Sequence, residues 1–364
     1  MNILYDYQIF QYQKYGGISR YFYELISWLS QQNEIKIPIV FSNNHYIKGN
    51  VLFNYLSIFQ NFDFKGKQKL MEIPNRFLSN SNLKKQNFDI FHPTYYNPYF
   101  LEYLGKKPFV LTIYDMIHEK FNDMFSYKDK TSIYKKVLAQ RATKIIAISN
   151  NTKQDIVNIF GIEEKKIDVV YLANSIPTVS SSTYDIKLPQ KYILFIGNRS
   201  GYKNFKTFVE AARRLLNFNK EINIVCIGGG EFNTKEKLFL EKMGIIRQIF
   251  QYDLSDKALA NIYKKAIMFI FPSLYEGFGI PILEAFANEC PVVCSSTGSF
   301  PEIAQNAALY FDPNSVESIE NSIYTLIDNN NLKKELVQNG RKRLANFSWE
   351  KTAAYTEKIY KEIL

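Results

Sequence analysis

Short apolar runs alternate with amphipathic segments along most of this chain. The runs at 192–196, 222–227 and 267–271 are almost wholly apolar, as expected of strands that are buried on both faces of a parallel sheet. The segments between them, such as 205–216, carry apolar residues at helical spacing. This alternation predicts an α/β protein with parallel sheets.

The first half of the chain repeats the same alternation. Strands are predicted at 2–5, 36–41, 88–91, 108–113, 144–148 and 167–171. A helix is predicted at 131–141, with Ile133, Val137 and Leu138 on its apolar face. The region from 42 to 87 lacks either pattern and is expected to form an irregular insertion.

The pattern indicates two domains. A length of 364 residues is large for one hydrophobic core, and a polar Ser/Thr run at 176–183 marks a change in composition. We therefore expect an N-terminal domain at 1–178, a linker at 179–190, a C-terminal domain at 191–348 and a terminal helix at 349–364.

Charge and cysteine content restrict the expected partners and the expected cellular location of the protein. The net charge is +10, and eight basic residues between Lys65 and Lys107 face only three acidic ones. Such a stretch is either a solvated basic face or a contact for an anionic membrane surface; no nucleic-acid-binding module accompanies it, so nucleic acid is not expected as a partner. Three cysteines without metal-ligand spacing, and no signal-peptide pattern or membrane-length apolar run, favour a cytoplasmic protein that is at most peripheral at the inner face of the cell membrane.

The most informative stretch is 272–285, which joins a predicted strand to a predicted helix. Gly277 and Gly279 allow the chain to turn with positive φ, and Pro281 suits the first turn of a helix. A glycine-rich loop before a helix N-terminus is suited to anions and sugar hydroxyls. Glu276 and Glu284 lie on either side of this junction, and without the surrounding motif they would be taken as solvated carboxylates.

A second loop, at 197–204, also follows a strand and precedes a helix. It has neither the Gly-Lys-Ser/Thr ending of a Walker A loop nor the Gly-x-Gly-x-x-Gly of a dinucleotide fold. It does contain Arg199 and Lys203, which are either solvated cations or ligands for phosphate oxygens.

The stretch around Glu276 and Glu284 resembles the Glu-x7-Glu motif of the retaining glycosyltransferases of family 4. The resemblance continues through Pro291-Val292-Val293, Phe311-Asp312-Pro313 and Phe347-Ser348-Trp349, and one departure is Glu289, where the family usually has a glycine in a local turn. The resemblance implies the GT-B fold, with two Rossmann-like, doubly wound domains facing a central cleft and a terminal helix that crosses back to the first domain.

The resemblance also implies roles for individual residues. It assigns Glu276, with Asp115 and His118 of the first domain, to the catalytic site. It assigns the nucleotide-sugar donor to Arg199, Lys203, Glu284, Gly277, Phe278, Gly279, Ile280, Gly16 and Gly17. The residue before Asp115 is commonly a histidine in the family and is Tyr114 here, so that His118 is the nearby histidine that could substitute.

The function implied by this resemblance is transfer of a hexose from a nucleotide sugar to a glycan or lipid-linked acceptor. The segments Gly-Asn-Arg, Tyr-Lys-Asn and Thr-Ile-Tyr-Asp-Met-Ile-His-Glu look most like bacterial mannosyltransferases of O-antigen and capsule assembly, which favours GDP-mannose. The chain contains no Asp-x-Asp pair, so neither a metal nor another cofactor is expected. The alternatives are a UDP-sugar donor, a UDP-sugar 2-epimerase and a non-catalytic GT-B subunit; a glycosidase would leave the Arg/Lys loop unexplained.

Overall fold

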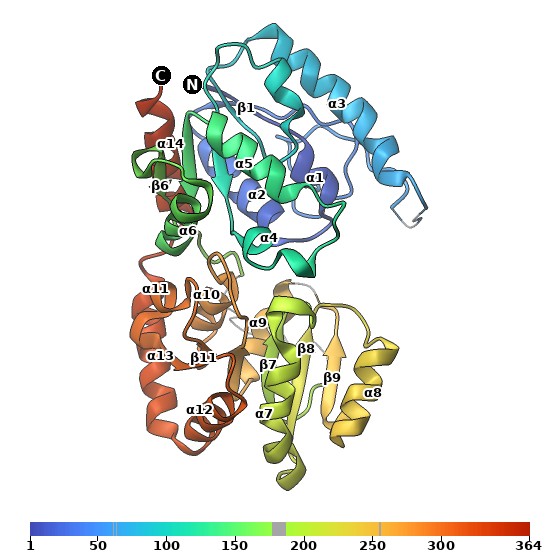
Figure 1. The fold of residues 1–364 in the computed structure, drawn as a ribbon, viewed down its shortest axis with the longest axis vertical. Coiled ribbons are helices and arrows are strands. Elements are labelled where there is room, and N and C mark those ends of the chain that lie inside the picture. The colour runs from blue at the N-terminus through green and yellow to red at the C-terminus, as the bar shows by residue number, and fades with distance from the viewer. Residues whose placement is uncertain (61, 63, 177–186, 255) are drawn as a thin grey trace. The chain divides into compact units, whose positions relative to one another are not determined.

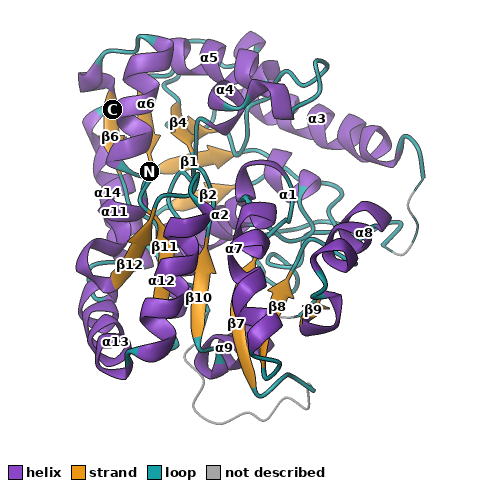
Figure 2. Ribbon diagram, turned by 60° about the horizontal axis from the view of Figure 1, so that its bottom comes forward, coloured by secondary structure: helices purple, strands orange, loops and turns teal. Residues whose placement is uncertain are grey.

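The protein consists of two compact units. The computed structural model describes every residue except 61, 63, 177–186 and 255. Unit 1 contains Met1–Leu172 together with Trp349–Leu364, and unit 2 contains Ala173–Ser348. In each unit parallel strands are flanked by helices (Figure 1, Figure 2). The division falls after Leu172, ahead of the expected boundary at 178, and most of the expected linker at 179–190 lies outside the described residues.

Unit 2 is built on one parallel sheet of six strands. From edge to edge these are β12 (Ala308–Phe311), β11 (Val292–Ser295), β10 (Met268–Phe271), β7 (Lys191–Ile196), β8 (Ile222–Ile227) and β9 (Ile249–Tyr252). The chain starts in the middle at β7, moves outward to β9, and then returns to β10 on the other side of β7. This reversal makes β7 and β10 the topological switch point, where open α/β sheets bind ligands at the carboxyl ends of their strands.

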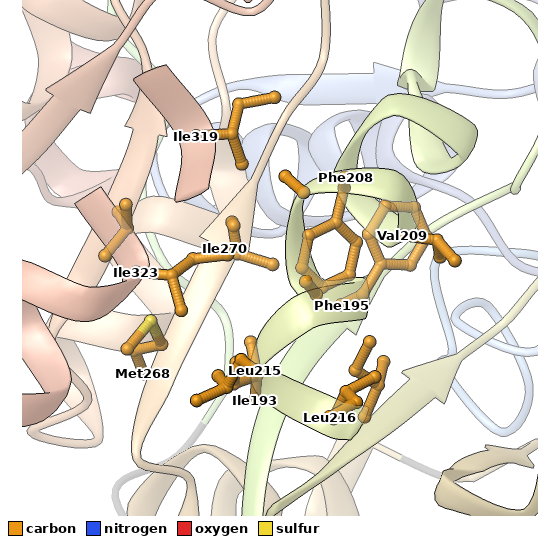
Figure 3. Close-up of a cluster of buried hydrophobic side chains, with 14 of the residues drawn as sticks. Ile193, Phe195, Phe208, Val209, Leu215, Leu216, Met268, Ile270, Ile319 and Ile323 are labelled. Carbon is orange, nitrogen blue, oxygen red and sulfur yellow. The ribbon is translucent and has the colours of Figure 1, made fainter. Parts of the chain in front are cut away.

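Helices cover both faces of this sheet. They are α7 (Phe205–Phe218), α8 (Thr234–Met243), α9 (Asp256–Lys265), α10 (Ile280–Ala287), α11 (Phe300–Ala304), α12 (Val316–Asp328) and α13 (Asn330–Leu344). The side chains of β10 alternate between the two faces, as a strand requires. Met268 and Ile270 join the cluster beneath α7 and α12 (Figure 3), whereas the ring of Phe269 packs against Tyr263 of α9, with ring centres 5.5 Å apart.

Unit 1 contains two parallel three-stranded sheets. One has the order β2 (Glu34–Lys36), β1 (Asn2–Tyr5), β3 (Ile90–His92); the other has the order β4 (Val110–Ile113), β5 (Lys144–Ala147), β6 (Ile167–Val169). A parallel bridge between Phe91 and Phe109 connects β3 to the start of β4. The helices are α1 (Gln8–Tyr12), α2 (Gly17–Leu29), α3 (Lys67–Lys85), α4 (Ile117–Lys120), α5 (Thr131–Arg141), α6 (Asn150–Phe160) and α14 (Trp349–Glu362). Both units thus have the Rossmann-like organisation expected from the sequence.

Two local predictions for unit 1 were wrong. The second strand, β2, ends at Lys36, where it had been expected to begin. The insertion at 42–87, expected to be irregular, contains the 19-residue helix α3. The face of α3 that is buried includes Asn75, whose side-chain oxygen accepts the backbone N–H groups of Val40 and Phe41 at 2.7 and 2.9 Å. Because part of this face is polar, apolar periodicity did not reveal the helix.

The turn after α10 explains the departure at Glu289. Glu289 has φ of 58°, in the left-handed region that favours glycine. The following residue closes the turn, since the N–H of Cys290 donates to the carbonyl of Ala285 at 2.9 Å. The turn therefore keeps a glycine-type conformation although it contains a glutamate, and the carboxylate of Glu289 pairs with Arg341 of α13.

A buried polar cluster attaches the C-terminal helix to unit 1. The hydroxyl of Tyr360, on α14, lies 2.5 Å from Nδ1 of His92 and 3.0 Å from the hydroxyl of Tyr5. On its other side, Nε2 of His92 lies 2.9 Å from the hydroxyl of Thr112. His92 is fully buried, and this burial lowers its pKa to about 3. The neutral imidazole thus connects β1, β3, β4 and α14.

This cluster predicts that the protein loses stability when the pH falls below neutrality. Folded His92 stays neutral down to about pH 3, whereas an unfolded histidine binds a proton near pH 6.5, so acid favours the unfolded chain. We expect His92 to lower the free energy of unfolding by about 2 kcal/mol between pH 7 and pH 5. Urea unfolding at the two pH values measures this change.

The control is the His92→Gln variant, measured under the same conditions. It should be less stable at pH 7, because it loses the two hydrogen bonds, but should show a smaller loss between pH 7 and pH 5. An equal pH dependence in both proteins would show that His92 does not titrate on unfolding.

Candidate active site

The two loops at the switch point of unit 2 bring a cation and a carboxylate into contact. Lys203 lies in the loop after β7, and Glu276 lies in the loop after β10. Nζ of Lys203 is 2.5 Å from Oε1 of Glu276, and the hydroxyl of Ser273 donates to the same oxygen at 2.8 Å. The two charged side chains are only 17% and 13% exposed. Their partial removal from water strengthens the attraction between them.

Aromatic rings border this ion pair. Nζ of Lys203 lies 5.2 Å from the ring centre of Tyr202 and 5.5 Å from that of Phe271. The faces of aromatic rings attract cations at such distances. Lys203 is therefore held at the carboxyl ends of β7 and β10 by a carboxylate and by two rings.

The loop that carries Glu276 ends in a left-handed residue that starts α10. Gly279 precedes the helix with φ of 95°, and Pro281 is the second helical residue. A Cβ atom on Gly279 would lie 3.1 Å from the ring of Phe300, so space as well as φ requires glycine here. Phe278 is buried and packs against Phe347, with ring centres 5.9 Å apart.

Sequence reasoning missed a third loop, 296–299, which supports the loop of Glu276. The hydroxyl of Ser299 donates to the carbonyls of Glu276 and Phe278 at 3.0 and 2.9 Å. A Cβ atom on Gly298 would lie 3.2 Å from the carbonyl oxygen of Glu276. The signal in the sequence was a small-residue segment, Ser296-Thr297-Gly298-Ser299, directly after the strand β11.

Glu284 lies inside unit 2, on α10, and is only 5% exposed. The hydroxyl of Tyr263, on α9, donates to its Oε2 at 2.9 Å. The assignment of Glu284 to ribose hydroxyls stays a prediction, and any such ligand shares this carboxylate with Tyr263.

Arg199 is buried and holds a turn of three consecutive glycines. Its guanidinium donates to the carbonyls of Gly228 and Gly230 at 2.9 Å each, and its Nε donates to Glu236 at 2.9 Å. The turn after β8 has φ values of 80°, 76° and 68° at residues 228–230. Partial burial alone would raise the pKa of Glu236, but hydrogen bonds from Arg199 and from the backbone N–H of Asn233 hold that pKa below its usual value. The side chain of Arg199 is 2% exposed. Its assignment to the diphosphate stays a prediction, because phosphate oxygens would have to replace Glu236 or the glycine carbonyls as its partners.

In unit 1, Asp115 lies after β4 and interacts with a buried lysine. Oδ1 of Asp115 accepts the N–H of Ile117 at 3.0 Å. Nζ of Lys135 lies 2.9 Å from the carbonyl oxygen of Asp115 and 2.9 Å from Oε2 of Glu119. The side chains of Lys135 and Glu119 are 1% and 3% exposed, and a charge so deeply buried needs such partners.

The position of Lys135 corrects the predicted face of α5. Ile133 and Val137 are exposed, whereas Lys135, Leu138 and Ala139 are buried. Nothing in the sequence around Lys135 indicated that it would be buried, because its acidic partner, Glu119, belongs to another helix.

His118 lines a cavity of about 620 Å³ within unit 1. Its ring stacks on Phe125, with centres 4.0 Å apart, and its Nε2 lies 3.5 Å from Oδ2 of Asp129. Glu119, Tyr127 and Lys136 also line this cavity. Asp115 and His118, which were expected to act together, thus have different neighbours: Asp115 contacts Lys135, and His118 contacts Asp129.

Tyr114 lies in the interior of unit 1, and the Gly16–Gly17 pair lies at the start of α2. Tyr114 is 6% exposed and packs against Tyr21, with ring centres 5.7 Å apart. Burial raises its pKa well above the usual value, so its hydroxyl stays protonated at neutral pH. Gly17 is the first residue of α2, and the side-chain oxygen of Gln13 accepts the N–H of Ser19 at 3.1 Å in the first turn of that helix. Gly16 is the N-cap of α2, so the prediction that this pair lies at a helix N-terminus is confirmed. A Cβ atom on Gly16 would lie 2.3 Å from the side-chain oxygen of Gln13.

Two family models match the chain. "Glycosyl transferases group 1" matches residues 180–343, and "Glycosyltransferase Family 4" matches residues 15–173. Together they leave out only the first 14 residues, six residues at 174–179 and the chain after 343.

Relatives and solved structures agree with these matches. The chain is 28% identical over 288 residues to O-antigen chain mannosyltransferase B of Escherichia coli, across 75% of this chain and 74% of the relative. It is 27% identical over 218 residues to O-antigen chain mannosyltransferase RfbU of Salmonella typhimurium, across 58% and 59%. Its fold is similar to that of HepE of Anabaena, solved in complex with UDP and glucose, with a TM-score of 0.76, 13% identity and 99% coverage of both chains.

The contacts of Arg199 predict a structural cost when its guanidinium is replaced. Arg199→Lys provides one ammonium group where the guanidinium reaches Glu236 and the carbonyls of the glycine turn. We expect a loss of about 1–3 kcal/mol in the free energy of unfolding and faster amide hydrogen exchange in residues 228–231. Urea unfolding and hydrogen exchange measure these changes. The exposed Arg213 of α7, changed to lysine, is the control; equal effects at both positions would contradict the anchoring role.

Proposed function

The chain belongs to the group 1 glycosyltransferases and has the GT-B fold, and we propose that it transfers a hexose with retention of configuration from a nucleoside-diphosphate sugar. The single observation that supports this most strongly is the contact between Lys203 and Glu276 at the switch point of unit 2. It provides a cation for the diphosphate and a carboxylate for the sugar hydroxyls within one partly buried site.

The proposed reaction follows from this pair. The bond between C1 of the sugar and the diphosphate oxygen breaks, a bond from C1 to the acceptor oxygen forms, and the acceptor proton is released. Negative charge develops on the leaving diphosphate, and a positioned cation stabilises it. Lys203 is the proposed cation, and the phosphate oxygens replace Glu276 as its partner. Glu276 is then able to accept hydrogen bonds from the sugar.

Mannose from GDP-mannose is the proposed sugar, because the two mannosyltransferases each match over more than half of the chain. The UDP complex of HepE keeps a UDP-sugar as the second candidate. We propose no metal, since the sequence lacks an Asp-x-Asp pair and Lys203 offers the positive charge.

The acceptor is proposed to be a glycan or a lipid-linked glycan, in bacterial surface polysaccharide assembly. The cavity beside His118 has carboxylates, a lysine and aromatic rings in its walls, which are the groups that bind sugar hydroxyls and sugar faces. We propose that unit 1 binds the acceptor there, in the cytoplasm. The basic stretch between Lys65 and Lys107 supports a peripheral contact with the anionic inner face of the cell membrane.

A UDP-sugar 2-epimerase and a non-catalytic subunit are the competing functions. An epimerase would change the sugar of the donor without any acceptor, so incubation with the donor alone distinguishes it. A non-catalytic subunit would bind nucleotide without transfer, and the direct contact between Lys203 and Glu276 argues against it.

Removal of either charge should slow transfer strongly. Lys203→Ala loses the cation, and Glu276→Ala loses the carboxylate; each should lower kcat/KM by about 10²- to 10³-fold. Radiolabelled sugar transfer to an acceptor extract measures this loss. Lys206→Ala, an exposed lysine three residues away, is the matched control, and circular dichroism checks the fold. Near wild-type transfer by both variants would contradict the assigned site.

Nucleotide binding should reveal the donor base. A ligand that binds only the folded protein stabilises it by about 2.7 kcal/mol at 100 times its dissociation constant. In the presence of EDTA, we expect GDP to raise the melting temperature more than UDP, ADP or dTDP, and Lys203→Ala to remove most of that shift. A larger shift with UDP would replace the proposed donor, and no shift with any nucleotide would contradict the donor site.

A further inference from the structure

The outer face of α3 exposes a stripe of large apolar side chains. Leu70, Ile73 and Phe77 are 49%, 62% and 76% exposed. Their spacing places them on one side of the helix. The buried residues of α3 lie on the opposite side at four-residue spacing: Lys67, Met71, Asn75, Ser79 and Leu83. The helix therefore carries apolar residues on two faces, and the face with Met71 and Leu83 is the one that packs on the rest of unit 1.

The loop before α3 adds further exposed rings. Phe62 and Phe64 are 72% and 46% exposed. The buried Lys67 ties this loop to the start of the helix, because its Nζ donates to the carbonyl of Phe62 at 2.7 Å and its backbone N–H to that of Phe64 at 3.1 Å. Isolated exposed apolar residues are normal on a protein surface, but five in the segment 62–77 on one loop and one helix face call for a partner. Figure 1 shows α3 along the outer edge of unit 1.

The charges around this stripe have mainly one sign. Lys65, Lys69, Arg76, Lys84 and Lys85 are exposed, and the sequence from 62 to 85 contains two acidic residues, Asp63 and Glu72, against six basic ones. Two of these cations lie against aromatic rings: Arg76 is 5.4 Å from the ring centre of Tyr99, and Lys84 is 4.8 Å from that of Tyr103. Long basic side chains beside apolar ones can reach phosphate groups while the apolar ones insert below them.

We propose that α3, together with Phe62 and Phe64 ahead of it, docks onto an anionic lipid bilayer, with Phe62, Phe64, Leu70, Ile73 and Phe77 inserted among the lipids. The lysines and Arg76 would then contact the lipid phosphates. A second copy of the chain fits this surface poorly, because a symmetric contact would bring its basic residues together. Among the described residues no helix is long and apolar enough to cross a membrane, so the proposed contact is a peripheral one. The proposal deepens the membrane contact given above and is independent of the donor site.

Vesicle flotation with the full chain tests the surface. Vesicles of phosphatidylcholine alone are compared with vesicles that also contain phosphatidylglycerol. We expect the wild type to bind the anionic vesicles, the triple variant Leu70→Gln/Ile73→Gln/Phe77→Gln to bind them at least tenfold less, and Lys65→Gln/Lys69→Gln/Lys85→Gln to lose the preference for anionic lipid. Phe218→Gln, at a position of α7 that is 81% exposed, is the control and should bind as the wild type does.

A fluorescent label shows whether the stripe itself enters the bilayer. The three native cysteines are buried, so a thiol-reactive, polarity-sensitive dye reacts at an introduced surface cysteine. On Phe77→Cys the dye should shift to shorter wavelength with anionic vesicles, whereas on Phe218→Cys it should not. Equal shifts, binding unchanged in the apolar variant, or no binding by the wild type would overturn the proposal.

Two further readouts separate this proposal from its alternatives. Analytical ultracentrifugation of the wild type and the apolar variant detects self-association; a dimer that only the wild type forms, without vesicle binding, would assign the stripe to a second copy. The shift in melting temperature caused by GDP or UDP should be the same in both proteins. A normal nucleotide shift without vesicle binding rejects the docking surface alone, and vesicle binding without any nucleotide shift rejects the donor site alone.

Discussion

Lys203 and Glu276 come into contact because β7 and β10 are neighbours in a sheet whose strand order reverses between them. They are 73 residues apart in the chain, yet each follows the carboxyl end of one of the two central strands. The side chains of β10 point alternately to the two faces of the sheet and pack against helices on both. The loop at 296–299 holds the backbone of Glu276. The chemistry of unit 2 thus depends on strand order first and on loop sequence second.

Buried cations organise the loops of both units. Arg199 holds the glycine turn after β8, and Lys135 connects the carbonyl of Asp115 to Glu119. Each is surrounded by oxygen atoms, as a charge out of water must be. Of the three cations discussed, Lys203 differs in that it is more exposed and has one carboxylate as its partner. A ligand can exchange with that carboxylate more easily than with the several oxygen atoms around Arg199.

Features that depend on a local pattern of residues could be predicted from the sequence. The strands β7, β8 and β10 and the loops of Lys203 and Glu276 were predicted from apolar runs, glycines and a family motif, whereas β9 was not predicted. The sequence was insufficient where partners come from distant segments. The burial of Lys135 depends on Glu119 from another helix, and the polar buried face of α3 depends on backbone groups near residue 40. Similarly, nothing near Arg199 in the chain indicates that it contacts a turn some thirty residues later. The assignments to donor and acceptor stay predictions, because contacts within the protein do not identify a ligand.

The charge balance of the site without a donor limits what can bind to it. Lys203 and Glu276 neutralise each other, so a ligand that takes Lys203 leaves a partly buried carboxylate without its cation. Binding of an anion alone is therefore opposed by the loss of the cation next to that carboxylate, since an unpaired charge in a partly desolvated site is unfavourable. A ligand that carries hydroxyl donors next to its phosphates supplies new hydrogen bonds to Glu276 and avoids this cost. Under the proposed assignment of Lys203 and Glu276 to the donor, the pair favours an intact sugar nucleotide over the nucleoside diphosphate that remains after transfer, and the two charges would then assist release of the product.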